Sequence, residues 1–387
     1  MKVTLFQYRL FHYRVRLFDL MRERCRERGI ELVLVHGQPF RDEAKKRDCG
    51  ELDWAVRVNN RYFPIVEKKD LCWQPAPREA RDSDLVIVMQ ENRLLANYVW
   101  ILRRAFGLGP RVAFWGHGRD FQSLATRGVR AGWKQFVSTR VDWWFAYTEL
   151  SRRCVLNYGF PPDRISVLNN AIDNQSFENE MECVTGQDLH DLRQELGFSP
   201  RHFVGLFCGS MYPDKRLDVL FDACQRVHDR FTDFRLVLIG DGVDRPLVEA
   251  QCARHSWIRY LGVQYGARKA ALYRLAQLTL CPGLVGLNIL DAFLSGVPLI
   301  TLSDSLHSPE IAYLEPGVNG HSVVGGAGAY ADCVLDLIRD DRARARLSEG
   351  ALAAAQRYTL ENMALRFVDG IEACLKIPVR SASGARL

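Results

Sequence analysis

The sequence has no long apolar segment and no paired cysteines. Every apolar run meets a charged residue within about ten positions, well short of the roughly 18 to 20 residues that span a bilayer. The eleven cysteines are scattered singly, without a CxxC pair, which argues against a disulfide framework and a zinc knuckle. Charged residues also interrupt the N-terminal stretch where a signal peptide has its apolar core. We therefore expect a cytoplasmic protein with reduced, mostly buried thiols.

Acidic residues are scarce in the first half of the chain. Residues 1–170 contain 30 Lys and Arg against 19 Asp and Glu, whereas the remaining residues contain 22 against 27. The basic half predicts an anionic partner. Basic residues alternate with Trp and Tyr at residues 132–148, and these rings favour a lipid headgroup region over a nucleic acid groove. We expect peripheral binding to an anionic membrane surface and no nucleic acid partner; the alternative is a solvated basic surface.

The length of 387 residues favours two domains, and apolar runs alternate with helical patterns in both halves. A helix is predicted at residues 14–28, and a polar stretch without sustained periodicity lies at residues 174–191. The pattern predicts an α/β fold of two doubly wound, Rossmann-like domains, residues 1–173 and 174–357, with a C-terminal helix within residues 358–387 that packs back on the first. The predicted strands are residues 2–8, 31–36, 84–89, 111–115, 143–147, 202–207, 234–239, 257–260, 278–281 and 297–301.

A glycine-containing loop precedes a short predicted helix within the segment CPGLVGLNILDAFLSGVPLI, residues 281–300. Free N–H groups and the helix dipole at such a turn suit a phosphate, and a carboxylate one turn into the helix suits a ribose diol. The alternative is an ordinary strand-to-helix turn with an exposed aspartate. The donor-binding residues expected here are Gly283, Gly286, Leu287, Asn288 and Asp291.

A second loop, GSMYPDKR at residues 209–216, follows the first predicted strand of the second half. Gly209 permits a tight turn beside Ser210, and Lys215 and Arg216 lie just ahead of a helix. Two cations at this strand end would neutralise a diphosphate leaving group held by the loop at residues 283–287. A solvated Lys-Arg pair is the alternative.

Three strand ends in the first half offer polar side chains. In the motif WGHG, residues 115–118, glycines on both sides let the backbone project His117 from the strand end, where α/β sheets place ligands. Arg14 and Arg16 follow the first strand and are candidates for an anionic acceptor, and Glu91 follows a later strand as a further acceptor contact. The alternatives are a structural histidine and arginines solvated on a helix.

The order of these motifs resembles the nucleotide-sugar domain of the retaining glycosyltransferases of family 4. GS and DK are followed by LIGDG, LG, the segment at residues 282–300 and SPEIAYLEPGVNG at residues 308–320, in the family's order. The resemblance implies the GT-B architecture, in which two Rossmann-like domains face each other across a cleft. It also implies that the C-terminal domain binds the donor and the N-terminal domain binds the acceptor.

The resemblance implies particular roles for four residues. Lys215 matches the family's phosphate-contacting lysine, and Asp291 falls where the family has a ribose-binding glutamate. His117 matches a histidine that touches the transferred sugar or supports the developing charge. Glu310 supplies a carboxylate near the sugar. We therefore take His117, Lys215 and Glu310 as the catalytic candidates.

The sequence departs from the family at two donor positions. In the family, the ribose-binding glutamate that matches Asp291 ends an E-x7-E motif, and the first glutamate of that motif falls on Gly283. The arginine that precedes the phosphate-contacting lysine in the family falls on Ser210. We expect transfer of a sugar, with retention, from a nucleotide diphosphate to a hydroxyl of a lipid-linked or saccharide acceptor in surface polysaccharide or lipopolysaccharide assembly. No Asp-x-Asp pair lies at the end of a predicted strand, so we expect no metal and no cofactor. The alternatives are a nucleotide-sugar epimerase or phosphorylase on the same scaffold, and a catalytically weak donor-binding protein.

Overall fold

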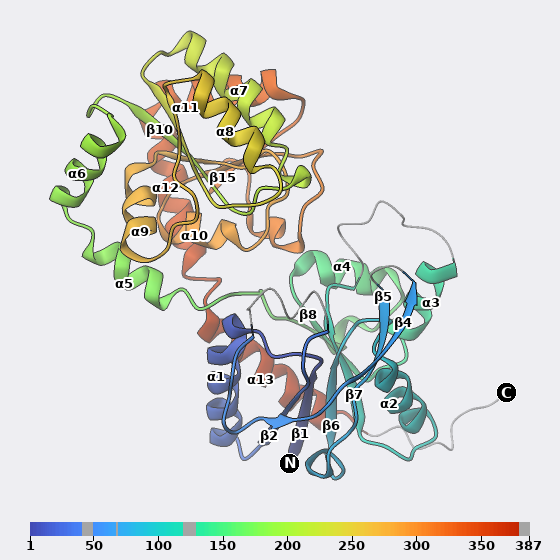
Figure 1. Cartoon of the computed structure of the whole chain (residues 1–387). Coiled ribbons are helices and arrows are strands. Elements are labelled where there is room, and N and C mark those ends of the chain that lie inside the picture. Colours follow the sequence, from blue (N-terminus) through green and yellow to red (C-terminus); the bar gives the residue numbers. More distant parts are fainter. Residues whose placement is uncertain (41–48, 67–68, 119–128, 379–387) are drawn as a thin grey trace. The chain divides into compact units, whose positions relative to one another are not determined.

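The computed structural model describes residues 1–40, 49–66, 69–118 and 129–378, which fold into two α/β units (Figure 1). Unit 1 comprises Met1–Asp173 and the C-terminal segment from Leu360, and unit 2 comprises Asn174–Thr359. Each unit has its own parallel sheet with helices on both faces. The predicted α/β architecture with two parallel-sheet domains is confirmed.

Unit 1 is built on a seven-stranded sheet of order β3-β2-β1-β6-β7-β8-β9, in which all paired strands are parallel. Its central strands are apolar on both faces because helices cover both sides. The strand order reverses between β1 and β6, a point at which α/β sheets place ligands outside the carboxyl ends of the strands. The strands are β1 (Lys2–Gln7), β2 (Glu31–His36), β3 (Val56–Arg57), β6 (Leu85–Met89), β7 (Arg111–Gly116), β8 (Trp143–Ala146) and β9 (Ile165–Val167).

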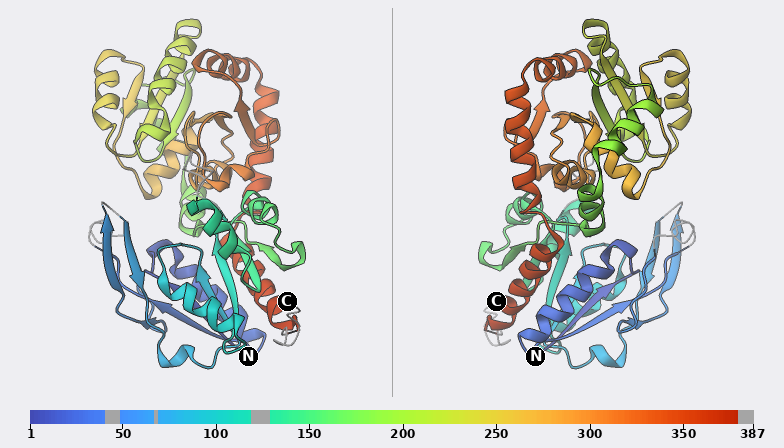
Figure 2. Two further views of the ribbon diagram at one scale, coloured as in Figure 1. Left: turned by 90° about the vertical axis from the view of Figure 1, so that its right-hand side faces the viewer. Right: turned by 90° about the vertical axis from the view of Figure 1, so that its left-hand side faces the viewer.

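Two sets of helices cover the sheet of unit 1. On one face, Trp100, Val137 and Val155 of three helices pack in one core cluster with alternate residues of the strands. On the other face, the first and last helices lie side by side (Figure 2). The helices of the first set are α2 (Leu95–Ala105), α3 (Val129–Ser138) and α4 (Glu149–Asn157), and those of the second are α1 (Val15–Glu27) and α13 (Leu360–Lys376).

Helix α13 completes the core of unit 1. The ring of Phe367 contacts the ring of Trp115 edge-on, with centroids 5.0 Å apart, and stacks on Phe145 at 4.5 Å. At Gly370 a Cβ would lie 2.3 Å from Ser166 Oγ, so only a glycine lets the helix lie this close to β9. Helix α13 therefore packs on unit 1.

Unit 2 has a six-stranded parallel sheet of order β12-β11-β10-β13-β14-β15, which reverses between β10 and β13. The loops after these two strands therefore meet at the carboxyl edge. The strands are β10 (Phe203–Cys208), β11 (Phe234–Ile239), β12 (Ile258–Tyr260), β13 (Leu278–Leu280), β14 (Leu299–Leu302) and β15 (Gly320–Val323). The helices around them are α7 (Leu217–Arg230), α8 (Arg245–Arg254), α9 (Gly266–Leu275), α10 (Asn288–Leu294), α11 (Ala327–Arg339) and α12 (Asp341–Ala355).

Strands β3, β9 and β15 were not among the predicted strands, and two further regions of regular structure were not expected either. The polar stretch after residue 174 forms helices α5 (Gln175–Cys183) and α6 (Gly186–Leu196). Helix α6 begins with a capping box, in which Thr185 and Asp188 bond to each other's backbone N–H groups. In unit 1, β4 (Arg61–Val66) and β5 (Lys69–Trp73) form an antiparallel hairpin. In α6 local bonds add to a narrow apolar face, so periodicity does not reveal this helix.

The aromatic segment at residues 132–148 divides between surface and core. Trp143 and Trp144 lie in β8 and are 5% and 0% exposed, and Trp144 Nε1 donates to the Ser138 carbonyl at 2.8 Å. The expectation that these two rings face a lipid surface is wrong, because the centre of a covered parallel strand is interior. Trp133 and Phe136 on α3 are exposed. In the part of the chain that the structure describes, no helix combines the length and apolar character needed to cross a bilayer.

Candidate functional site

Two glycine loops meet at the carboxyl edge of unit 2. A Cβ at Gly240, after β11, would lie 1.9 Å from the Gly209 carbonyl oxygen, after β10. A Cβ at Gly242 would lie 2.1 Å from the Met211 carbonyl oxygen, and the Met211 N–H donates to the Asp241 carbonyl at 2.9 Å. Close backbone approach therefore requires glycine at both positions, and it brings the GS and LIGDG motifs together.

Lys215 links this loop to the one after β13. It ends the short helix η5 (Pro213–Lys215) and is 5% exposed. Its Nζ donates to the Leu284 carbonyl at 2.5 Å, and the Leu284 N–H donates to the Asp214 carbonyl at 2.8 Å. The ammonium also lies 3.8 Å from the position that a Cβ of Gly209 would occupy. The structure thus brings Lys215 onto the loop at residues 283–287.

The contact between the loop at residues 214–215 and the loop at residues 283–284 also explains why residue 283 is a glycine and not the glutamate usual in the family. A Cβ there would lie 2.2 Å from the Asp214 carbonyl oxygen and 2.3 Å from the Lys215 carbonyl carbon. These are backbone atoms, which cannot rotate away as a side chain does. The glycine therefore belongs to a closer approach of the two loops, and a glutamate would force them apart.

His307, which the sequence analysis did not identify, follows β14 and bonds to the β13–α10 loop. Its Nδ1 accepts the Val285 N–H at 3.2 Å, and its Nε2 lies 2.8 Å from the Leu302 carbonyl. These partners assign the neutral ring with the proton on Nε2. Burial lowers the pKa of His307 below its ordinary value, with the charge of Lys215 as a smaller cause. Ser305 adds a bond to the Pro282 carbonyl at 2.7 Å.

Helix α10 begins after Leu287 and carries Asp291 in its first turn. Asp291 is 8% exposed and lies 2.8 Å from Lys269 Nζ. Burial raises the pKa of the Asp291 carboxyl above its usual value, and the Lys269 ammonium opposes this only in part. The Gly286 N–H donates to Asn288 Oδ1 at 2.9 Å, so this expected phosphate donor is engaged within the loop.

The remaining donor candidates lie around this loop. Arg216 adopts the left-handed conformation, with φ of 52°, and its Nη1 lies 3.3 Å from Asp304 Oδ1 and 3.1 Å from Ser305 Oγ. It thus faces the loop after β14. Ser210 is exposed, and Glu310 is buried in the short helix η6 (Pro309–Tyr313). Among the described residues, no group of three His, Cys, Asp or Glu side chains is arranged to hold a metal ion.

In unit 1, His117 is exposed at the end of β7. Its ring stacks on the Tyr147 ring with centroids 4.1 Å apart. Gly118 has φ of 77°, and a Cβ at Gly116 would lie 2.8 Å from Gln90 Cβ, so both glycines are required. Gln90 Nε2 donates to the Gly118 carbonyl at 3.1 Å. This turn presents the imidazole at the carboxyl edge of the sheet.

Arg14 supports this arrangement from within. It is 4% exposed, and its Nη2 donates to Asn170 Oδ1 at 2.6 Å. Its guanidinium lies 5.6 Å from the centre of the Tyr147 ring, on which His117 stacks. The interior position gives Arg14 a supporting role for Tyr147, and a direct contact with an acceptor stays a prediction.

The other two acceptor candidates form ion pairs. Arg16 on α1 lies 3.7 Å from Asp173 and 3.6 Å from Glu361, and about half of its side chain is exposed. Glu91 follows β6 and accepts from Arg93 Nε at 2.6 Å. Both side chains lie within reach of solvent near the start of α1 and the end of β6, and their contact with an acceptor stays a prediction.

Both parts of the chain match family models. Residues 202–340 match the model described as glycosyl transferases group 1, and residues 15–176 match the model described as glycosyltransferase family 4. The two matches divide between unit 2 and unit 1 in the order that the motifs predict.

Curated relatives agree with these families. A D-inositol 3-phosphate glycosyltransferase of Corynebacterium glutamicum is 30% identical over 217 residues, which cover 52% of this chain and 50% of that protein. A phosphatidyl-myo-inositol mannosyltransferase of Mycobacterium leprae is 28% identical over 287 residues, which cover 72% of this chain and 70% of that protein. The chain thus spans half the length of the first relative.

A solved structure matches nearly the whole chain. Anabaena HepE in complex with UDP superimposes with a TM-score of 0.66 at 16% identity, over 96% of this chain and 100% of that one. At this identity the similarity shows the fold alone. It confirms the predicted GT-B architecture of two Rossmann-like domains.

Proposed function

Because the chain belongs to the glycosyltransferases of group 1 and family 4 and has the GT-B fold, we propose that it transfers a sugar from a nucleoside diphosphate to an acceptor hydroxyl with retention at the anomeric carbon. The bond between the sugar C1 and the diphosphate oxygen breaks, a bond from the acceptor oxygen to C1 forms, and the acceptor proton is released. Negative charge grows on the diphosphate as it departs. The site must therefore hold positive charge there in advance.

The observation that carries this proposal is the position of Lys215. Its buried ammonium is fixed on the Leu284 carbonyl, between the loops that follow β10 and β13. A cation held in a desolvated position stabilises a developing anion without reorganisation, and it acts more strongly there than in water. A diphosphate bound over the β13–α10 loop would lie against this ammonium.

Three other residues complete the proposed site. Asp291 accepts the ribose hydroxyls, and Lys269 holds its carboxylate at 2.8 Å. Glu310 and His117 are the residues proposed to act on the transferred sugar. The stacking of His117 on Tyr147 supports its assignment, because it fixes the plane of the imidazole at the strand end.

The acceptor is proposed from the relatives. One is named for D-inositol 3-phosphate and another for phosphatidyl-myo-inositol, both acceptors with a phosphate. We extend this to a lipid-linked or saccharide acceptor in the assembly of a surface polysaccharide or lipopolysaccharide. The excess of basic residues in the first half of the chain suits such a substrate, with the enzyme in the cytoplasm at the inner face of the membrane.

A donor screen tests the function. UDP- and GDP-sugars are titrated by calorimetry, and turnover of the donor that binds is then measured for the wild type and Lys215→Ala. We expect transfer to fall about 10²- to 10³-fold, as for other preorganised contacts to a developing anion. Arg230→Ala is the matched control, because Arg230 is an exposed cation on α7 that pairs with Asp332. Lys215→Ala turnover within about threefold of wild type would remove Lys215 from the site. Conversion of one nucleotide sugar to another, without release of nucleoside diphosphate, would favour the epimerase alternative.

A further inference from the structure

Helix α5, which the sequence analysis did not predict, packs on helix α9 of unit 2 (Figure 1). The half-buried ring of Phe177 on α5 meets the ring of Tyr273 on α9 edge-on, with centroids 5.6 Å apart. Met181, one turn further along α5, is 7% exposed, and its Sδ lies 3.7 Å from Oγ of Ser295 at the end of α10. Helix α5 therefore contacts both α9 and the end of α10.

Glu180 holds α5 against the start of α9. A Cβ at Gly266, the first residue of α9, would lie 3.1 Å from Glu180 Oε2 and 3.2 Å from Oε1. The N-cap residue Tyr265 provides no side-chain hydrogen bond to this helix, and its first turn contains no acidic residue. A carboxylate at a helix N-terminus is stabilised by the helix dipole. This contact supports the position of α5 on α9.

The ammonium of Lys269 on α9 contacts both Phe177 and Asp291. Its Nζ lies 4.6 Å from the centre of the Phe177 ring and 2.8 Å from Asp291 Oδ2. Only 21% of the Lys269 side chain and 11% of the Asp291 side chain are exposed. A cation over an aromatic ring is attracted by the ring's quadrupole, and more strongly where water is partly excluded. Phe177 thus holds the ammonium where it meets the carboxylate.

Asp291 keeps one carboxylate oxygen for a ligand. In the part of the chain that the structure describes, Lys269 bonds to Oδ2 and no hydrogen bond engages Oδ1. The backbone of Asp291 is held as well, because its carbonyl accepts from Ser295 Oγ at 2.8 Å. Burial raises the pKa of the Asp291 carboxyl, and the Lys269 ammonium lowers it. Lys269 therefore both directs the carboxylate and favours its ionised form.

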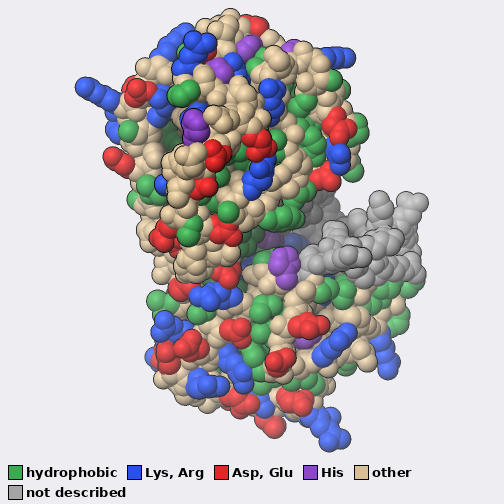
Figure 3. Space-filling view, turned by 60° about the vertical axis from the view of Figure 1, so that its left-hand side comes forward, with side chains coloured by type: hydrophobic (Ala, Val, Ile, Leu, Met, Phe, Trp, Pro, Cys, Tyr) green, Lys and Arg blue, Asp and Glu red, His purple; other side chains and the backbone are tan. Residues whose placement is uncertain are grey.

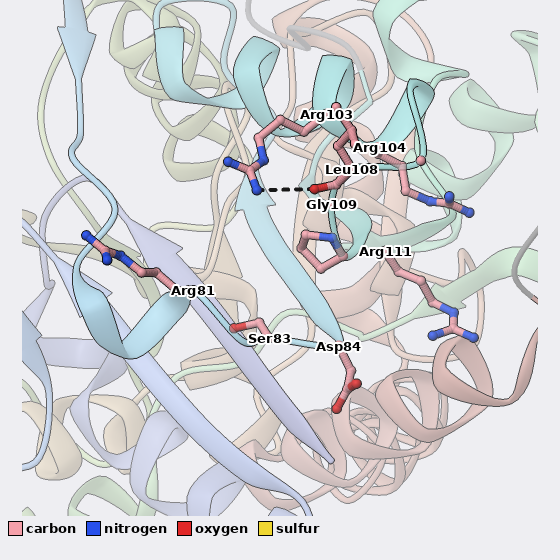
Figure 4. Close-up of a pocket in the computed structure, with 10 residues that line it drawn as sticks. Arg81, Ser83, Asp84, Arg103, Arg104, Leu108, Gly109 and Arg111 are labelled. Carbon is pink, nitrogen blue, oxygen red and sulfur yellow. Dashed lines mark hydrogen bonds between the residues drawn. The ribbon is translucent and has the colours of Figure 1, made fainter. Parts of the chain in front are cut away.

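Cations elsewhere in the molecule are not directed at one carboxylate in this way. On the side that Figure 3 presents, acidic and basic side chains are exposed and interspersed. In unit 1 a hollow of about 410 Å³ lies beside the α2–β7 loop, and Figure 4 shows Arg81 and Arg103 on one side of it and Arg104 and Arg111 on the other. Arg103 donates to a backbone carbonyl of that loop at 3.2 Å. These guanidinium groups do not converge, whereas Lys269 meets a single buried acceptor.

We propose that Lys269 and Phe177 are positioning residues for the ribose site: Phe177 holds the Lys269 ammonium, and Lys269 directs the Asp291 carboxylate toward the ribose hydroxyls. The inference rests on the proposed function for the assignment of the ribose to Asp291. Helix α5 then takes part in the selection of a ribonucleotide through α9, rather than by a direct contact with the nucleotide.

The ratio of two affinities tests the inference. UDP, GDP and the 2′,3′-dideoxy form of each are titrated by calorimetry into the full chain, and the affinity of the nucleotide that binds is divided by that of its dideoxy form. The variants are Lys269→Met, Phe177→Leu and Phe177→Tyr, with Asp291→Ala to test the ribose site itself. Arg268→Gln is the matched control, because Arg268 is an exposed cation on α9 that pairs with Glu195.

The wild type is expected to prefer the ribonucleotide about 10- to 100-fold, as for a hydrogen bond to a charged acceptor. Asp291→Ala lowers this ratio to about 1, and Lys269→Met lowers it to within about threefold of 1. Phe177→Leu lowers the ratio about fivefold, because the cation loses its ring. Phe177→Tyr, which keeps the ring, and Arg268→Gln leave it within about twofold of wild type. The affinity for the dideoxy form stays within about threefold of wild type throughout.

A wild-type ratio in Lys269→Met, beside a lost ratio in Asp291→Ala, would overturn the inference and leave the proposed function standing. An equal fall of both affinities in Lys269→Met and Phe177→Leu would also overturn it, because a merely structural loss does not distinguish the two sugars. If neither nucleotide bound, or if Asp291→Ala kept the wild-type ratio, the ribose site of the proposed function would fail and the inference with it. Phe177→Leu removes no charge, so it carries the test if circular dichroism shows that Lys269→Met does not fold.

Discussion

Replacing Gly283 by alanine probes how closely the loops after β10 and β13 must approach each other. The new Cβ would lie 2.2 to 2.4 Å from three backbone atoms of Asp214 and Lys215, at least 1 Å inside the 3.4 Å at which ordinary contact begins. The loops must therefore separate by about 1 Å, because no atom in the contact belongs to a side chain. The bonds of Leu284 to Asp214 and Lys215, 2.8 and 2.5 Å, cross the same contact and lengthen with it.

Overpacking of this kind lowers the free energy of unfolding by about 1 to 3 kcal/mol. A contact among backbone atoms belongs at the upper end of that range. For a unit of this size, about 3 kcal/mol lowers Tm by roughly 6 to 12 °C. The rate of sugar transfer falls by more than the loss of folded protein at the assay temperature, because Lys215 moves with the loop. Gly283→Glu, which introduces the residue usual in the family, lowers both Tm and the rate of transfer by more than Gly283→Ala does.

Gly286→Ala is the matched control for this change. Its Cβ would meet only Ser308 Oγ and other side-chain atoms, at 3.6 Å or more, so we expect Tm within about 2 °C of wild type. Thermal unfolding followed by circular dichroism, with calorimetric titration of the nucleoside diphosphate, measures both effects. If Gly283→Ala unfolded at the same temperature as Gly286→Ala and bound the nucleotide equally well, the close approach of the loops would be refuted.

Three further predictions concern His117, His307 and Arg14. His117→Ala lowers transfer while leaving the affinity for nucleoside diphosphate unchanged, because the proposed nucleotide site lies in unit 2; calorimetry showing affinity and turnover falling together would contradict this. His307 has a pKa lowered by burial, so the unfolded chain takes up its proton first, and this part of the stability is complete above about pH 6.5 and is lost as the pH falls toward the folded pKa. Tm measured from pH 8 to pH 5 therefore falls less steeply for His307→Gln than for wild type, and equal slopes would exclude the histidine as a cause. Arg14→Met lowers the free energy of unfolding by about 2 kcal/mol, because a buried charge-assisted hydrogen bond to Asn170 is lost. Denaturant unfolding of the wild type and the variant measures this difference. An unchanged unfolding midpoint would show that the bond does not support the unit.

Ten of the strands in the described residues were predictable, because a covered parallel sheet leaves continuous apolar runs in the sequence. The runs at residues 31–36 and 234–239 coincide with β2 and β11, and the short helix expected at residue 288 is α10. Helix α6 left no such signal. Its first turn is held by the capping box of Thr185 and Asp188, and much of its surface is polar.

Sequence analysis could identify candidate site residues only where a reactive or charged side chain follows a predicted strand end. Lys215 lies on the loop at residues 283–287 as expected, since both follow neighbouring strands. His307 could not be predicted, because both of its partners are backbone groups of Val285 and Leu302, and their positions depend on the folded loops. The burial of Arg14 depends in the same way on Asn170, which is distant in sequence.

Product analysis of a single turnover tests the central claim most directly. The protein is incubated with the nucleotide sugar that it binds and with an extracted lipid-linked acceptor, and the products are followed by NMR. The account predicts one nucleoside diphosphate released for each glycoside formed, with the anomeric configuration of the donor kept in the product. A glycoside of inverted configuration would contradict retention, and a changed nucleotide sugar with no diphosphate released would contradict glycosyl transfer itself.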